Sequence, residues 1–152
     1  MSQNRPSTEL LEQYAPLNMW ERAEKEAQRS PHYRHKTGCV IYCGVGHNEL
    51  FSTGTAHPHS GGRRSFSIHA EMHAISRLPP KSHNGVAVIV TLNKSGKNFA
   101  ANSRPCVHCA NLLKNHVMTV IYPELCNDGS WAIRVVDAAI LCSGYLKPTK
   151  TT

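Results

Sequence analysis

The chain has 152 residues, of which 40% are hydrophobic and 7% aromatic, and its formal net charge at pH 7 is +7. This length predicts a single domain over residues 1–152 with a core over about 17–146. The short apolar runs exclude a membrane-spanning helix, which needs about 18 or more consecutive apolar residues. The positive charge favours anionic partners, either nucleotide phosphates or nucleic acid, although few aromatic residues are present to stack on single strands.

The N-terminal sequence and the cysteines indicate the cellular compartment and the state of the thiols. The N-terminal residues lack the apolar stretch of a signal peptide, so we expect a cytoplasmic protein. The six cysteines then lie in a reducing compartment, where Cys-x-x-Cys indicates metal or redox chemistry rather than disulfides.

The first predicted elements are helical. Apolar residues recur at helical spacing over residues 10–17, where Pro16 should break or restart the helix. The same spacing continues over residues 20–27 with charged residues on the opposite face. We therefore expect an amphipathic helix that ends at Ser30-Pro31.

A hairpin and a loop should follow. Gly38–Cys43 is typical of a buried strand, residues 44–48 of a turn, and Leu50–Thr55 of the returning strand. His57–Ser67 is rich in Gly, Pro, His and Arg, which favours a loop. The next helix should begin at the motif His69-Ala70-Glu71 and continue to about Leu78.

The second half of the chain alternates between strands and helices. Val86–Leu92 is nearly continuously apolar, which predicts a central strand. Pro105 suits the first turn of a helix, and Cys106, Cys109, Ala110 and Leu113 follow at a spacing that would place both thiols on its inward face.

The last predicted strands form a second hairpin. Val117–Tyr122 and Trp131–Val136 flank the turn residues Asn127-Asp128-Gly129, so the two strands should pair antiparallel. Val136–Leu141 fits either a short helix or an extended tail. The alternation as a whole predicts an α/β domain with one mixed sheet covered on both faces.

Two short motifs carry the chemistry. His69 together with Cys106 and Cys109 offers one imidazole and two thiolates, a set that leaves the fourth position of a tetrahedral zinc ion open for water. Glu71 would supply the acid and base function that such a water needs. Cys-x-x-Cys alone would also fit a structural zinc site or a redox pair. The combination favours catalysis, because the order of the motifs, the proline and the placement at successive helix starts all agree. The helix dipoles at these starts also favour thiolate over thiol.

Several other residues are further candidates for the site or its surroundings. We interpret His73 as a packed or supporting histidine and expect His108 to point away from the metal. The four other cysteines, Cys39, Cys43, Cys126 and Cys142, are expected to be ordinary thiols. Arg63 and Arg64, in the loop before His69, fit either a phosphate contact or a solvated hinge.

The pattern His-x-Glu followed by Pro-Cys-x-x-Cys resembles the cytidine deaminase-like superfamily, and His69–Ile75 looks most like its deoxycytidylate branch. The resemblance implies a three-layer α/β/α sandwich with a five-stranded mixed sheet whose last two strands are antiparallel. It also implies zinc bound by His69, Cys106 and Cys109, with Glu71 as the proton carrier. Base contacts would fall on the Ala70 N–H and the carbonyl near Arg104.

One position departs from the superfamily pattern. Many relatives have an asparagine at the end of the second strand that contacts the sugar, whereas this chain has Ala56. Either His57 replaces that contact or the sugar is held differently.

The resemblance implies a hydrolase of nucleotide metabolism that deaminates cytosine in a free nucleoside or nucleotide, and relatives often form homo-oligomers. One alternative is a deaminase of single-stranded DNA or RNA, acting on cytosine or adenine. Another is a zinc-stabilised binding module without catalysis. Steep salt dependence of binding would indicate the nucleic acid substrate, because phosphate contacts release counterions.

Overall fold

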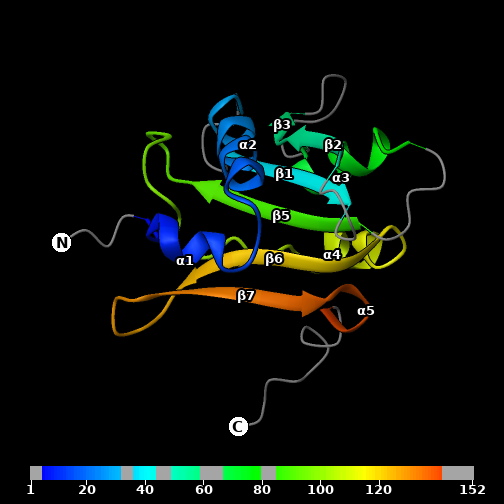
Figure 1. Cartoon of the computed structure of the whole chain (residues 1–152). Coiled ribbons are helices and arrows are strands. Elements are labelled where there is room, and N and C mark those ends of the chain that lie inside the picture. Colours follow the sequence, from blue (N-terminus) through cyan, green and yellow to red (C-terminus); the bar gives the residue numbers. More distant parts are fainter. Residues whose placement is uncertain (1–4, 32–35, 44–48, 59–66, 80–84, 142–152) are drawn as a thin grey trace, which may run out of the picture.

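The computed structural model describes residues 5–31, 36–43, 49–58, 67–79 and 85–141 (Figure 1). Its centre is a five-stranded sheet in the order β2-β1-β5-β6-β7. Only β5 and β6 run parallel, so the sheet is mixed as expected. The strands are β1 (Lys36–Cys43), β2 (Leu50–Thr55), β5 (Gly85–Leu92), β6 (Val117–Leu125) and β7 (Trp131–Asp137).

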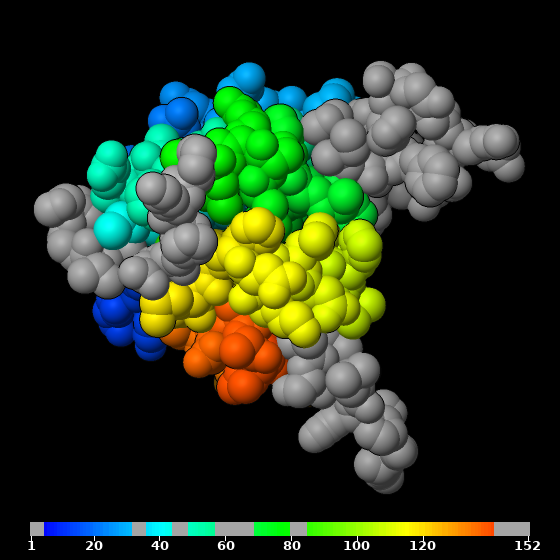
Figure 2. All heavy atoms as spheres, turned by 90° about the vertical axis from the view of Figure 1, so that its right-hand side faces the viewer, coloured from blue at the N-terminus to red at the C-terminus, as the bar shows by residue number. Residues whose placement is uncertain are grey.

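Helices cover both faces of this sheet and complete the predicted three-layer sandwich. One face carries α1 (Thr8–Glu12) and α2 (Leu17–Gln28), and the other carries α3 (Ala70–Ser76), α4 (Val107–Leu113) and α5 (Ala138–Leu141). Figure 2 shows the green residues of α3 next to the yellow-green residues around α4. Among the described helices, none is long and apolar enough to cross a membrane.

Alternating residues of the strands build a separate core on each face. On β1, Val40 and Tyr42 pack towards α2, whereas Cys39 and Ile41 pack towards α3 and α4. This alternation follows from the two-residue period of a strand. Because β5 lies in the middle of the sheet, both of its faces are buried, which explains its continuous apolar sequence.

Two glycines allow helices to approach the sheet closely. An added Cβ at Gly38 would lie closer than 3.0 Å to the main chain of Ala23 and Ala27 in α2. An added Cβ at Gly54 would meet the Ala70 carbonyl oxygen and the Ala74 nitrogen of α3 in the same way. The position of α3 therefore depends on the missing side chain at Gly54.

Both predicted hairpins are confirmed by antiparallel pairing, of β1 with β2 and of β6 with β7. The first turn, 44–48, lies outside the described residues. In the second, Gly129 has a positive φ of 89°, a conformation that glycine adopts readily. Of the two alternatives for residues 136–141, the structure has the short helix α5, which follows β7 directly.

The structure differs from the prediction at the end of β6 and in the loop before α3. Strand β6 continues through Pro123 to Leu125 instead of ending at Tyr122. It pairs with β5 only as far as Ile121 and next meets Asn102 at Glu124, so Pro123 lies between these two pairings, where a missing N–H is tolerated. The loop predicted over His57–Ser67 begins and ends in a short antiparallel pairing of β3 (His57–Pro58) with β4 (Ser67–Ile68).

Candidate metal centre

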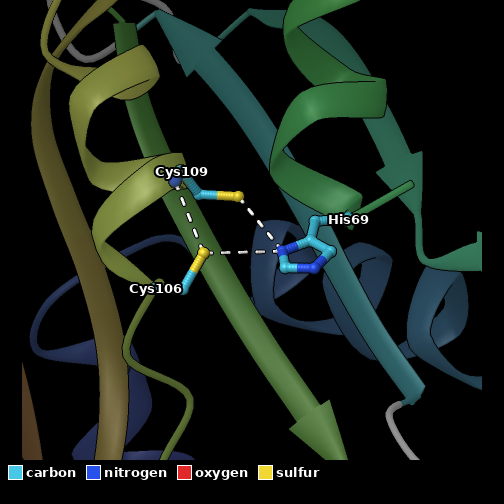
Figure 3. A group of neighbouring side chains, drawn as sticks. All are labelled: His69, Cys106 and Cys109. Atoms are coloured by element: carbon cyan, nitrogen blue, oxygen red, sulfur yellow. Dashed lines mark hydrogen bonds between the residues drawn. The ribbon is translucent and has the colours of Figure 1, made fainter. Parts of the chain in front are cut away.

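Three side chains from two helix starts converge at the predicted site (Figure 3). His69 Nδ1 lies 3.3 Å from Cys109 Sγ and 3.6 Å from Cys106 Sγ. Potential ligand atoms of all three residues lie within 4.8 Å of one another. His69 is the N-cap of α3, and Cys106 is the N-cap of α4. The sheet thus brings together two motifs that are 37 residues apart in the chain.

The donor set fits zinc. Zinc bonds to histidine nitrogen and cysteine sulfur are about 2.0–2.3 Å long, so tetrahedral neighbours should lie about 3.5 Å apart. The observed nitrogen–sulfur distances of 3.3 and 3.6 Å agree with this value. Because only three protein groups converge among the described residues, the geometry leaves room for one further ligand.

The two cysteines occupy different environments, which corrects one expectation. Cys109 is fully buried with Ala110 and Leu113 on the inward side of α4, as predicted, but Cys106 is exposed. Helix α4 begins at Val107, so Pro105 precedes the N-cap and does not lie in the first turn. As an N-cap, the Cys106 sulfur points back and accepts the N–H of Cys109 at 3.5 Å.

The surroundings of the buried Cys109 thiol oppose its ionisation to thiolate unless a cation is bound. Burial raises the pKa of Cys109, and the nearby charges of Glu71 and Cys106 raise this pKa further. Without a metal ion, these effects outweigh the expected stabilisation of thiolate at the helix start. A divalent cation would reverse this balance, since it stabilises the thiolate directly.

Glu71 lies in the first turn of α3 and is only 4% exposed. Burial raises the pKa of its carboxyl group, while hydrogen bonds with its own main chain and with Cys109 lower that pKa. Glu71 does not belong to the converging ligand group. A buried carboxyl group beside a metal site can act as a general acid and base.

A cavity of about 330 Å³ opens beside this centre. Its wall includes two predicted substrate contacts, Ala70 and Arg104, together with Glu71. His57 follows the lining residue Ala56 directly in the chain, but its side chain lies outside the described part of the structure, as do Arg63 and Arg64. The wall is formed by Thr37, Ala56, His69, Ala70, Glu71, Thr91, Asn102, Ser103, Arg104 and Cys106.

Sequence analysis missed four polar residues of this wall: Thr37, Thr91, Asn102 and Ser103. Asn102 and Ser103 lie three and two residues before Pro105 of the second motif, and that proximity could have indicated them. Thr37 and Thr91 reach the cavity only because β1 and β5 pair in a register that sets them opposite each other.

The remaining histidines of the two motifs are not ligands in this arrangement. His73 Nδ1 accepts the main-chain N–H of Thr55 at 3.0 Å, which ties α3 to the end of β2. This contact agrees with the interpretation of His73 as a supporting residue. His108 is exposed, as expected for a side chain that points away from the metal.

Comparison with known proteins gives a family match and a set of distant structural neighbours. The family described as the cytidine and deoxycytidylate deaminase zinc-binding region matches residues 15–123. No curated protein sequence matches the chain.

A variant of cytidine deaminase from Mycobacterium tuberculosis superposes with a TM-score of 0.51 at 14% identity, over 89% of this chain and 96% of that chain. RibD from Acinetobacter baumannii gives a TM-score of 0.41 at 19% identity, over 76% of this chain and 28% of that chain. At such identity, the likeness to the mycobacterial enzyme supports the fold alone.

Proposed function

This chain belongs to the cytidine and deoxycytidylate deaminase family, whose cofactor is zinc, and on that premise we propose that it hydrolytically deaminates cytosine in a free nucleoside or nucleotide. The observation that carries the proposal is the convergence of His69, Cys106 and Cys109 beside a cavity whose wall includes the buried Glu71. An open ligand position next to an acid and base group distinguishes a catalytic zinc site from a structural one.

We assign His69, Cys106 and Cys109 as the zinc ligands. When bound, zinc supplies Lewis-acid activation of a water molecule. Glu71 takes a proton from that water and delivers it to the ring nitrogen of the base. The water oxygen adds to the carbon that bears the amino group, and Glu71 then helps to protonate the departing nitrogen, so cytosine and water become uracil and ammonia.

The cavity wall supports a small substrate. The Ala70 N–H and the carbonyl near Arg104 are the proposed contacts to the base, and both residues line the cavity. Arg104 is exposed and positively charged, which suits an anionic group at the mouth. His57, Arg63 and Arg64 remain proposed contacts to the sugar or phosphate. We further propose a homo-oligomer in nucleotide metabolism, as the resemblance implies, and a cytoplasmic location.

The decisive experiment combines a substrate panel with one substitution. Zinc-loaded protein is incubated with cytidine, deoxycytidine, dCMP, dCTP, adenosine and a single-stranded oligonucleotide, and ammonia release is measured. Glu71→Gln should keep zinc but lower turnover by roughly 10²–10⁴-fold, because proton transfer is removed while the ligands remain. Glu26→Gln is the matched control, since Glu26 is also buried but lies on α2, outside the cavity.

Each outcome has a defined meaning. Ammonia from the cytosine nucleosides or nucleotides would support the proposal. Ammonia from adenosine alone would overturn the assignment to cytosine, and ammonia from the oligonucleotide alone would favour the polynucleotide alternative. Ammonia from no compound would overturn both enzyme readings. Full activity of Glu71→Gln would remove Glu71 from the mechanism.

A further inference from the structure

Three hydroxyl groups line the part of the cavity that is formed by the sheet and the loop before α4. Thr37 on β1 and Thr91 on β5 are direct strand partners, and their Oγ1 atoms lie 2.9 Å apart. Ser103 Oγ accepts the main-chain N–H of Thr91 at 2.9 Å, and the Ser103 residue is only 3% exposed. The hydroxyls thus belong to a linked group whose members are held by the sheet.

This group retains unused hydrogen-bonding capacity. Each hydroxyl can donate one hydrogen bond and accept two. The Thr37–Thr91 contact uses one of the two threonine protons, and Ser103 acts only as an acceptor towards Thr91. Within the described residues, one threonine proton and the Ser103 proton therefore have no protein acceptor. The wall can donate to and accept from a bound molecule at the same place.

The adjacent residue, Ala56, cannot serve this purpose. Its main-chain N–H donates to the Thr37 carbonyl at 3.0 Å, and its own carbonyl accepts the Ser30 hydroxyl at 2.5 Å. Both main-chain groups already have protein partners, and the side chain is only a methyl group. The asparagine contact that many relatives make at this position has no counterpart here.

We propose that Thr37, Thr91 and Ser103 form the subsite that binds a hydroxyl group of the substrate sugar and so favours nucleosides over the free base. A sugar hydroxyl both donates and accepts, which matches the mixed capacity of this wall. A phosphate offers mainly acceptors and is better matched by arginine, which makes Arg104 at the mouth its more suitable partner. This inference rests on the proposed function, because it concerns the same cavity.

The test compares cytidine with free cytosine as substrates of the zinc-loaded protein. The double substitution Thr37→Val and Thr91→Val keeps the side-chain shapes and removes both partners of one hydrogen bond, so little stability should be lost. We expect kcat/KM for cytidine to fall about three- to tenfold, mainly through KM, while kcat/KM for cytosine stays unchanged. Thr53→Val is the matched control, because Thr53 is buried on β2 opposite Val40 and does not line the cavity.

A binding measurement separates this inference from the proposed function. Calorimetry on the same proteins gives the Kd of uridine and of uracil without any turnover. The double variant should lose affinity for uridine alone, about three- to tenfold. Equal losses for uridine and uracil, or no loss for either, would overturn the subsite. An unmodified protein that binds uridine no better than uracil would overturn it as well, whereas failure to release ammonia from any compound would count against the proposed function only.

Discussion

Gly54→Ala should weaken zinc binding although residue 54 touches no ligand. The added methyl group would lie well under 3.0 Å from the main chain of Ala70 and Ala74, and ordinary contact begins near 3.4 Å, so α3 must retreat by about 1 Å. His69 caps this helix, and zinc sites tolerate deviations of only about 0.2 Å in ligand distances. We therefore expect zinc affinity to fall roughly 10–100-fold. Overpacking should also cost about 1–3 kcal/mol of stability, or roughly 2–12 °C in Tm.

Gly38→Ala is the matched control, because it creates the same clash against α2 on the opposite face of the sheet. Thermal unfolding of both metal-free variants gives the stability loss, and competition with a chromogenic chelator gives the zinc affinity. The two variants should lose similar stability, and only Gly54→Ala should lose zinc affinity. Equal zinc affinities in the two variants would refute the reasoning that Gly54 sets the position of His69.

Three further outcomes are expected. Protein in zinc at about 100 times Kd should have a Tm about 5–10 °C higher than the same protein treated with a chelator. Calorimetry would detect the difference, and added zinc should restore the higher Tm. The free energy of unfolding of the metal-free protein, measured in urea, should decline as the pH rises above about 8.5. Burial raises the pKa of the Cys39 and Cys109 thiols, so above this pH they ionise only in the unfolded chain. An unfolding free energy that stays constant between about pH 7 and 9.5 would contradict this. Hydrogen bonds from Ser130 lower the pKa of Asp128, so Asp128→Ala should destabilise the hairpin at neutral pH. In unfolding experiments the difference from the unmodified protein should shrink as the pH falls below the ordinary aspartate pKa of 3.8.

Local sequence signals were sufficient for most elements of the fold. The apolar run of β5 indicated a central strand, and the turn at Asn127–Gly129 indicated the last hairpin, both of which the sheet confirms. These signals are reliable because they depend on neighbours in the chain. The extension of β6 through Pro123 was missed, since it depends on where pairing with β5 stops.

Most residues of the metal centre could also be predicted from the sequence. Cys106 and Cys109 are three residues apart at a helix start, a local arrangement that tertiary structure only needs to orient. The burial of each thiol could not be predicted in the same way. The inward stripe predicted burial of both thiols, but the capping position turns Cys106 towards solvent while Cys109 stays buried.

The sequence by itself thus determined the residues for the chemistry, since His69, Glu71, Cys106 and Cys109 are defined by short spacings. Tertiary structure decided which other groups share their cavity. Thr37 and Thr91 are 54 residues apart and meet only through the register of β1 and β5, and Ser103 joins them through one hydrogen bond to a main-chain N–H. Strand register is set by burial on both faces of the whole sheet, so no short motif contains it.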